Sequence, residues 1–195
     1  IITIDGEDSR DFDDAVEVEI LKNGNFMLGV HIADVSEYVR PKTALDEEAY
    51  SRSTSVYFPD RVIPMLPKEL SNGICSLNEG EPRLTLSCVM EITPAGDVVN
   101  REICKSVIKS AKRMTYTAVQ AILDGDKQVR KEYKKFVGEI ENMRLLQLAL
   151  TAKRNERGSI DLDVRDSHIS VDDGVINVEP QTSLDAYKII EEFMV

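Results

Sequence analysis

Four aspartates near the N-terminus, Asp5, Asp11, Asp13 and Asp14, have a spacing that points to chemistry. Two bare carboxylates about 4 Å apart repel by roughly 1 kcal/mol in water and up to ~4 kcal/mol in a partly buried site, so a converging set needs a positive partner. Mg²⁺ prefers oxygen ligands and commonly binds one or two carboxylates together with phosphate and water. The spacing therefore favours a magnesium site. A solvated acidic loop is the alternative, because acidic residues are common in turns.

Two such ions about 3.5 to 4 Å apart would activate a water and stabilise the departing oxygen of a phosphodiester, the reaction that this ligand set most naturally supports. An EF-hand is excluded by spacing. Counted from Asp5, the twelfth position is Val16 instead of Glu, and Gly6 stands at the second position instead of the sixth. An aspartyl-phosphate phosphatase built on Asp11 and Asp13 would need a buried parallel strand and alternating strands and helices. The chain reads as antiparallel hairpins instead.

Composition sets the limits for the rest of the chain. Its 195 residues suffice for one domain, which at this size buries roughly 70% of the surface of the unfolded chain. No apolar run approaches the ~20 residues of a membrane span, so we expect no membrane partner. The net charge of −11 argues against general affinity for nucleic acid, and residues 1–19 carry eight acidic residues against one basic residue. Three cysteines without metal-type spacing indicate free thiols in a reducing compartment, hence a cytoplasmic location.

The elements that must position the aspartates can be read from the periodicity of the sequence. Alternating apolar residues predict one hairpin at residues 15–32 and a second at residues 83–109. Thr43 and Asp46 resemble a capping box for a helix that ends at about Arg52. Helical spacing predicts helices over residues 116–123 and 127–157, followed by short strands at 159–164, 167–171 and 175–179 and a final helix from about Ser183. The expected fold is α+β, a mixed, largely antiparallel sheet with helices packed on it.

The longer motifs identify a family resemblance. Residues 3–15 (TIDGEDSRDFDDA) and 31–36 (HIADVS) resemble the opening of the catalytic domain, called RNB, of ribonuclease II and ribonuclease R. Similar blocks follow in the family order at residues 54–59 (TSVYFP), 63–67 (IPMLP), 70–78 (LSNGICSLN), 157–160 (RGSI) and 190–194 (IEEFM). The resemblance covers almost the whole chain and is slightly closer to ribonuclease R. Residues 1–195 are therefore expected to be a partial RNB domain, truncated at both ends of a longer parent.

The resemblance implies a processive, hydrolytic exoribonuclease that degrades single-stranded RNA from its 3′ end and releases nucleoside 5′-monophosphates. Magnesium is the implied cofactor, as two ions with substrate and with Mn²⁺ as a substitute. Carried over residue by residue, the family's four catalytic and metal-binding aspartates match Asp5, Asp11, Asp13 and Asp14. Asp5 and Asp14 are the choice for the more tightly held ion, and Asp13 for the residue whose loss most damages chemistry.

The resemblance also assigns residues that bind RNA. Tyr57 matches a tyrosine that stacks on the base near the scissile bond, although composition alone favours a core aromatic, the role we expect for Phe58. A second stacking aromatic of the family is replaced here by Leu162, which weakens the case for a two-sided clamp. One of Glu191 and Glu192, a pair that the family shares, is expected to face the site.

Other candidates are expected to be structural. His31 ends an apolar strand and is interpreted as a packed, hydrogen-bonded residue. Asp34 is interpreted as bonded to nearby backbone. The basic residues of the second hairpin and beyond are a weak candidate for guiding phosphates, whereas residues 127–135 read as a solvated helix face. The basic residues considered for guiding phosphates are Arg101, Lys105, Lys109, Lys112 and Arg113.

A different class of function remains open, because some domains of this architecture have lost their aspartates. The chain would then be a non-catalytic RNA-binding or scaffolding piece. Family members add an arginine-bearing segment and flanking oligonucleotide-binding barrels. Since neither is present here, the isolated chain is expected to bind RNA poorly and turn over slowly or not at all.

Overall fold

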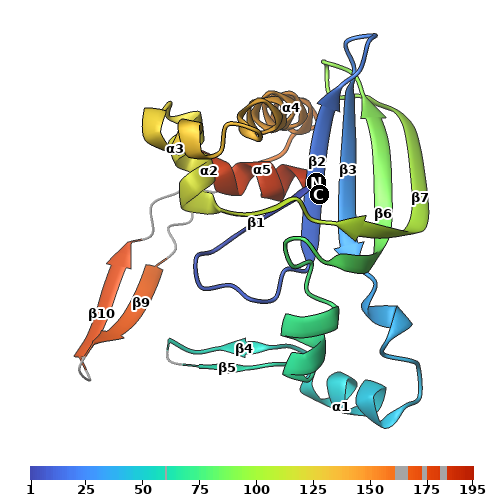
Figure 1. Cartoon of the computed structure of the whole chain (residues 1–195), viewed down its shortest axis with the longest axis vertical. Coiled ribbons are helices and arrows are strands. Elements are labelled where there is room, and N and C mark those ends of the chain that lie inside the picture. The colour runs from blue at the N-terminus through green and yellow to red at the C-terminus, as the bar shows by residue number, and fades with distance from the viewer. Residues whose placement is uncertain (60, 161–166, 173–174, 181–183) are drawn as a thin grey trace.

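The structure is a computed structural model, which describes residues 1–59, 61–160, 167–172, 175–180 and 184–195 (Figure 1). Its centre is a six-stranded sheet with the strand order β7-β6-β3-β2-β1-β8. Neighbouring strands are antiparallel except β1 and β8, which are parallel. The strands are β1 (Ile2–Asp5), β2 (Asp14–Ile20), β3 (Phe26–Ala33), β6 (Pro82–Ile92), β7 (Val98–Lys109) and β8 (Lys112–Thr115). The predicted α+β class with a mixed, largely antiparallel sheet is confirmed.

Both predicted hairpins are present as β2–β3 and β6–β7. In the first, Gly24 takes a φ of 84°, which permits the tight turn, and the side chain of Asn23 accepts a hydrogen bond from the amide of Asn25. The parallel pairing of β1 with β8 joins segments more than one hundred residues apart, and no local pattern predicts it. This pairing places Thr115, the last residue of β8, beside Asp5.

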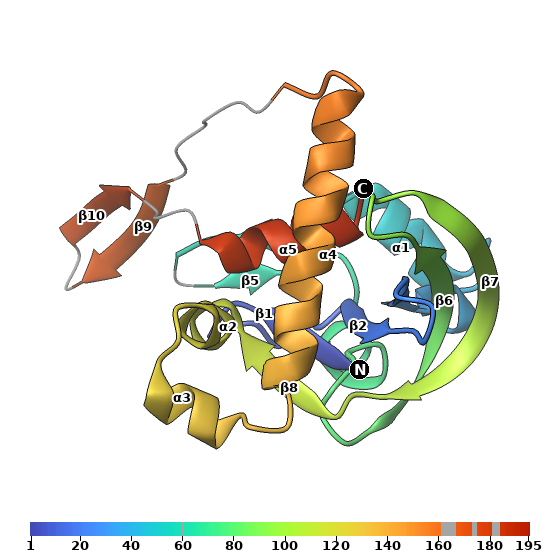
Figure 2. The same ribbon diagram turned by 90° about the horizontal axis from the view of Figure 1, so that it is seen from above.

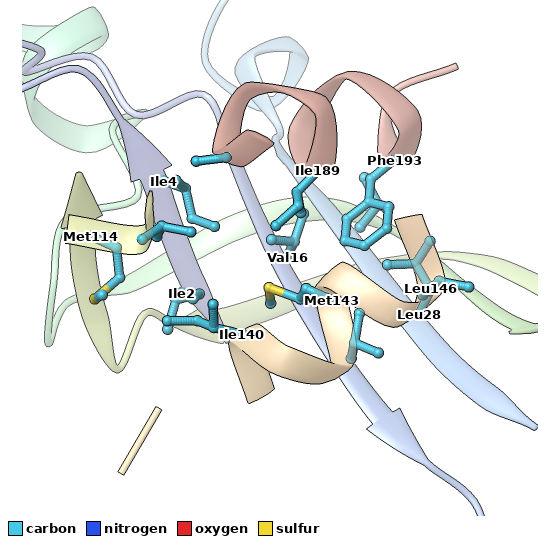
Figure 3. Packing of buried hydrophobic residues seen from close by; sticks show 14 of the residues in the cluster. Ile2, Ile4, Val16, Leu28, Met114, Ile140, Met143, Leu146, Ile189 and Phe193 are labelled. Carbon is cyan, nitrogen blue, oxygen red and sulfur yellow. The ribbon is translucent and has the colours of Figure 1, made fainter. Parts of the chain in front are cut away.

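Helices cover one side of the sheet (Figures 1 and 2). They are α2 (Tyr116–Leu123), α3 (Lys127–Glu132), α4 (Val137–Glu156) and α5 (Asp185–Phe193), of which α4 packs on β2 and α5. The side chain of Thr115 caps α2 by accepting from the amide of Ala118. We call the buried residues between these helices and the strands the helix-covered core. Those labelled in Figure 3 are Ile2, Ile4, Val16, Leu28, Met114, Ile140, Met143, Leu146, Ile189 and Phe193, and the core also contains Val18, Phe26, Val30, Ile92, Val119, Ile122 and Ala186.

The helix predicted over residues 127–157 is wrong in its continuity, because the chain breaks into α3 and α4 at residues 133–136. Tyr133 and Phe136 still pack against the helix-covered core. The apolar spacing was therefore a correct guide to burial, but packing does not require the intervening turn to be helical. Gly138, a poor helix former directly after the break, weakens the helix at this point.

A smaller layer lies at the end of the sheet below β2 and β3 in Figure 1. It contains the short helices η1 (Val35–Glu37) and η2 (Glu69–Ile74), helix α1 (Ala44–Arg52) and the hairpin of β4 (Val56–Tyr57) and β5 (Val62–Ile63). Thr43 caps α1 as expected, since its hydroxyl accepts from the amide of Asp46 at 3.3 Å. The carboxylate of Asp46 accepts in turn from the amide of Lys42.

The last described strands are β9 (Ser167–Asp172) and β10 (Val175–Pro180), which pair as the third predicted hairpin. Most of the strand expected at 159–164, Leu162 and the expected start of the last helix at Ser183 lie outside the described residues. The three cysteines are free thiols, as predicted. None of the helices within the described ranges has both the length and the apolar character needed to cross a membrane.

Candidate active site

The four aspartates lie on the loop that joins β1 to β2, which we call the aspartate loop (residues 5–14). Asp5 is the last residue of β1 and Asp14 is the first of β2. Because these strands are antiparallel neighbours, the end of one lies beside the start of the other. The sheet therefore fixes the two ends of the loop, and Asp11 and Asp13 lie on the segment between them. Figure 1 shows this loop in blue at the lower end of the sheet.

The second half of the aspartate loop is anchored through Phe12. This ring is 5% exposed and packs into what we call the site-supporting cluster, which consists of Phe12, Ala15, Ala33, Cys75, Leu77 and Ile108. The fully buried hydroxyl of Ser76 accepts from the amide of Phe12 and donates to the carbonyl of Arg10, each at 3.0 Å. The amide of Leu77 donates to the carbonyl of Phe12 at 2.8 Å. With Phe12 buried, Asp11 and Asp13 remain accessible on either side of it.

The first half of the loop is held by Arg113 of β8. Its guanidinium donates to the carbonyl of Gly6 at 2.9 Å and to that of Glu7, and lies over the Phe12 ring at 5.3 Å from the ring centre. A turn closes this half, since the amide of Ser9 donates to the carbonyl of Gly6 at 3.3 Å. Sequence reasoning missed the roles of Ser76 and Arg113, because their contacts are mainly with loop backbone and depend on the tertiary fold.

The basic group offered for guiding phosphates is therefore largely engaged within the protein. The guanidinium of Arg113, which is partly buried, donates to the backbone of the aspartate loop. Lys105 pairs with Asp34 at 3.2 Å and with Glu37 at 2.9 Å. Lys112 pairs with Glu79 at 3.0 Å. These cations stabilise the domain's own carboxylates and backbone, which leaves less positive charge on β7 and β8 for RNA than the sequence suggested.

The electrostatics of the loop show that its carboxylates act on one another. Burial, with the negative charge of Asp14 next in size, raises the pKa of Asp5 to about 7, against the lowering effect of Arg113. Burial and then the charge of Asp13 raise the pKa of Asp14. The pKa of Asp13 is raised by partial burial and by the charge of Asp11. The loop thus concentrates negative charge that its own arginine only partly offsets.

The donor set fits magnesium in type and in charge. Carboxylate oxygens are the ligands that this ion prefers, and a cation would relieve the repulsion that raises these pKa values. Within the described ranges, no three or more His, Cys, Asp or Glu side chains are grouped closely enough to hold a metal ion. Binding would therefore have to draw the aspartates closer together.

Tyr57 belongs to this site. It lies on β4 with a 65% exposed side chain, and its hydroxyl donates to a carboxylate oxygen of Asp11 at 3.0 Å. Tyr57, Asp11 and Asp13 line a cavity of about 410 Å³ with several apolar side chains. The expectation that Phe58 is a core residue is wrong, because it is 44% exposed and stacks under Arg61. The hairpin of β4 and β5, with two residues in each strand, is too small to bury either ring.

A second cavity, of about 750 Å³, lies along the first half of the aspartate loop. Its lining is polar and mixed in charge: Glu7, Asp8, Ser9, Arg10, Phe12, Lys68, Asn72, Asn78 and Arg113. The loop therefore has a hollow on both sides, one lined partly by apolar groups beside Tyr57 and one lined by polar groups beside Arg113.

The remaining candidates have structural roles. His31 is buried, and its Nδ1 is hydrogen-bonded to the hydroxyl of Ser87 at 2.7 Å, so the expectation of a packed histidine is confirmed. Asp34 is buried and accepts from Ser36 at 2.6 Å, which lowers its pKa together with the contact to Lys105. Its carboxylate also accepts from the backbone amide of Glu37, so the expected backbone contact is present beside the two side-chain partners.

The expectation that Glu191 or Glu192 faces the site is wrong. Glu192 is buried between α5 and α4, where it accepts from Thr151 at 2.8 Å and pairs with Arg154 at 2.7 Å. Glu191 lies 3.8 Å from the same Arg154. The pair therefore fastens the last helix to α4, since an amphipathic helix can bury a charged residue where the neighbouring helix offers a partner.

A mixed sheet that supports an anchored loop of four interacting aspartates defines a class of protein, an α+β domain with an acidic candidate active site. Comparison with known proteins gives the family, because the sequence matches the model of the RNB domain over residues 1–195. The chain belongs to the RNB domain family.

Relatives agree with this placement. Ribonuclease R of Thermotoga maritima is 52% identical over 199 residues, covering 100% of this chain and 28% of the relative. Ribonuclease R 1 of Lactococcus lactis is 50% identical over 194 residues, covering 98% of this chain and 24% of the relative. The chain thus spans only about a quarter of the length of these relatives.

Solved structures agree with the fold. Mycoplasma genitalium RNase R in complex with ribose methylated single-stranded RNA matches with a TM-score of 0.90 at 30% identity, covering 100% of this chain and 30% of that one. Yeast Ssd1, described as a pseudonuclease, matches with a TM-score of 0.76 at 18% identity, covering 98% of this chain and 23% of that one. The second likeness concerns the fold alone, so the fold by itself does not decide between catalysis and its loss.

Proposed function

We propose that the chain is the catalytic part of a magnesium-dependent exoribonuclease that hydrolyses single-stranded RNA processively from the 3′ end and releases nucleoside 5′-monophosphates. The observation that carries the proposal is the aspartate loop, in which four carboxylates act on one another while Phe12 and the sheet hold the backbone. Membership of the RNB family supports ribonuclease chemistry. We place the activity in the cytoplasm, in keeping with the free thiols.

The proposed roles follow from the positions of the aspartates. Asp5 and Asp14, fixed by the ends of neighbouring strands, would hold the more tightly bound ion. Asp11 and Asp13, on the segment between them, would complete the ligand set for a second. Magnesium, or manganese in its place, would lower the pKa of the attacking water and stabilise the departing oxygen.

The cavity beside Tyr57 suits the terminal base of a single strand. An exposed aromatic face contributes roughly 1 to 3 kcal/mol per stacked base, without sequence preference. The hydrogen bond from the Tyr57 hydroxyl to Asp11 holds the ring at the edge of the acidic loop. A base on this ring would leave its phosphate near the carboxylates, which is the placement that cleavage of the last linkage needs.

Affinity for RNA must come mainly from elsewhere in the parent protein. Phosphate binding depends on Lys and Arg, whereas this chain has a net charge of −11 and several of its cations are paired internally. We therefore propose that flanking RNA-binding domains of a longer parent supply positive charge. The greater length of the relatives supports this proposal.

The alternative is a non-catalytic RNA-binding or scaffolding domain. The likeness to a protein described as a pseudonuclease is the observation that keeps it open. The presence of aspartate at all four positions favours catalysis, because unopposed carboxylates are a cost to a domain that merely scaffolds.

Product analysis separates these possibilities. The full-length protein that carries this chain would be incubated with single-stranded RNA labelled at its 5′ end, with Mg²⁺ and with a chelator. We expect a ladder that shortens from the 3′ end, nucleoside 5′-monophosphates as products and no reaction in the chelator. Internal cuts, or cleavage in the chelator, would contradict the proposal. Bound but intact RNA would favour the alternative.

A further inference from the structure

We propose that Arg113 is a positioning residue for this site: its guanidinium joins the two halves of the aspartate loop and so sets the place of Asp5 relative to Asp11 and Asp13. The inference rests on the proposed function and adds a residue to it. Arg113 lies 99 or more positions from every aspartate of the loop, in a strand that the sequence did not predict.

The two halves of the aspartate loop are anchored by different residues. The second half is held by Ser76 and Leu77, and by the amide of Ala33, which donates to the carbonyl of Asp13 at 2.9 Å. The hydrogen bonds of Arg113 go to the first half, at the carbonyls of Gly6 and Glu7. These two peptide groups follow Asp5 directly, so Arg113 controls where the chain goes after that aspartate.

Arg113 lies on the strand that pairs with β1. β8 runs parallel to β1, with Arg113 beside Thr3 and Thr115 beside Asp5. The strand that supports the backbone of Asp5 therefore also carries the side chain that holds the loop after it. The carboxylate of Glu7 adds a contact to the hydroxyl of Thr117 at the start of α2. Displacement of the loop would thus require the β8–α2 corner to release it.

Arg113 also contacts the ring of Phe12, which lies between Asp11 and Asp13. A guanidinium over an aromatic face is attracted by the ring, and arginine provides both a flat stacking surface and directed donors. One side chain therefore contacts Gly6 and Glu7 in the first half and Phe12 in the second. Lysine keeps the charge and a donor but loses the flat surface, whereas methionine keeps only the apolar stem.

The test uses the full-length protein with Arg113→Met, Arg113→Lys and the charge-matched control Lys131→Met, which removes an exposed cation from α3, on the helix face interpreted as solvated. The measurements are kcat and KM on single-stranded RNA, and hydrogen exchange of backbone amides. For Arg113→Met we expect kcat to fall on the order of 100-fold with KM near the wild-type value, since small displacements of reacting groups have effects of this size. Arg113→Lys should fall between Arg113→Met and wild type.

Hydrogen exchange tests the anchoring without reference to activity. In Arg113→Met, the amides of the aspartate loop should exchange faster while those of β2 and β3 stay protected, and Lys131→Met should change neither. Unchanged kcat in Arg113→Met would overturn the inference. A rise in KM without a fall in kcat would overturn it too, because it indicates that Arg113 binds phosphate. Faster exchange throughout the sheet would also overturn it, because it indicates a general loss of structure. If wild type itself fails to degrade RNA, the proposed function fails, whereas protected loop amides in Arg113→Met would show that the anchoring is wrong.

Discussion

The helix-covered core and the site-supporting cluster differ in size, composition and location. The former fills the space between the sheet and α2, α4 and α5 with large aliphatic side chains. The latter has six buried residues, two of them alanine, and one aromatic ring. Its neighbours are hydrogen-bonded backbone groups of the aspartate loop and, from the short helices η1 and η2, the side chains of Val35 and Leu70.

This difference indicates that one cluster mainly stabilises the domain and the other mainly positions the aspartate loop. Burial of large apolar side chains contributes most of the stability, at about 25 cal/mol per Å² of apolar surface. The small cluster contributes less of this surface, but it determines where the loop backbone lies. Substitutions in the first region should therefore act on folding, and those in the second should act on the site more strongly than on stability.

The largest effect on stability is expected in the helix-covered core. Leu146→Ala removes a fully buried side chain of α4 and should lower the free energy of unfolding by about 2 to 5 kcal/mol. Leu148→Ala, at a 48% exposed position of the same helix, should change it by less than about 0.5 kcal/mol. Urea denaturation measures both, and equal losses would break the distinction between buried and exposed positions.

In the site-supporting cluster, Ser76→Ala leaves the amide of Phe12 and the carbonyl of Arg10 without their shared buried partner. We expect a loss of about 1 to 3 kcal/mol in the free energy of unfolding. Turnover should fall further than the folded fraction does, because the loop is displaced. Ser51→Ala, at an exposed position of α1, is the control. Activity that simply tracks the folded fraction would show that the cluster only stabilises.

The acidic loop should cost stability in a pH-dependent way. The pKa of Asp5 is raised to about 7 in the folded state by burial and then by Asp14, whereas an unfolded aspartate has a value of about 3.9. Between these values the folded state keeps a proton that the unfolded state has lost, so this contribution to stability declines as pH rises from about 4 to about 7.

Without divalent metal, Asp5→Asn should therefore be more stable than wild type above pH 7, by about 1 kcal/mol. The difference should shrink towards pH 4 and vanish below it, where the Asp5 carboxyl becomes protonated in both states. Denaturation in a chelator between pH 4 and 8 measures it, and comparing the two proteins cancels the contributions of other carboxyls. A difference independent of pH would contradict the assignment to the Asp5 carboxylate.

The smallest effect is expected where charges meet at the surface. Lys105→Met removes pairs with the buried Asp34 and with Glu37 and should cost less than about 1 kcal/mol, because the Lys105 ammonium is exposed and solvent screens its charge. Added salt should reduce the difference from wild type. A loss as large as that of Leu146→Ala would mean that this corner, and not the helix-covered core, dominates folding.

The sequence predicted those parts of the fold that depend on local pattern. The hairpins β2–β3 and β6–β7 and the cap at Thr43 were recognisable from alternation and turn residues. The pairing of β1 with β8 was not, because nothing local in a four-residue strand identifies a distant partner. The break between α3 and α4 was missed because apolar spacing reports burial, which continues through the break.

The same division holds for the site. The aspartates were found because their spacing suits a magnesium site and because residues 3–15 resemble the opening of the RNB domain. Ser76 and Arg113 were not, since each acts mainly through the loop backbone and no residue type marks such a contact. Arg113 also follows Lys112 in a basic run, which favoured a phosphate-guiding interpretation. Only the tertiary fold distinguishes a cation that binds substrate from one that binds its own loop.

The central claim is that the aspartate loop performs chemistry on RNA, and Asp13→Asn in the full-length protein tests it most directly. The exchange removes one charge at an accessible position and keeps the shape of the side chain. With 5′-labelled single-stranded RNA and Mg²⁺, we expect wild type to shorten the strand from the 3′ end. The variant should leave it intact while binding it with similar affinity and unfolding at a similar urea concentration. Shortening by the variant at the wild-type rate would contradict the claim.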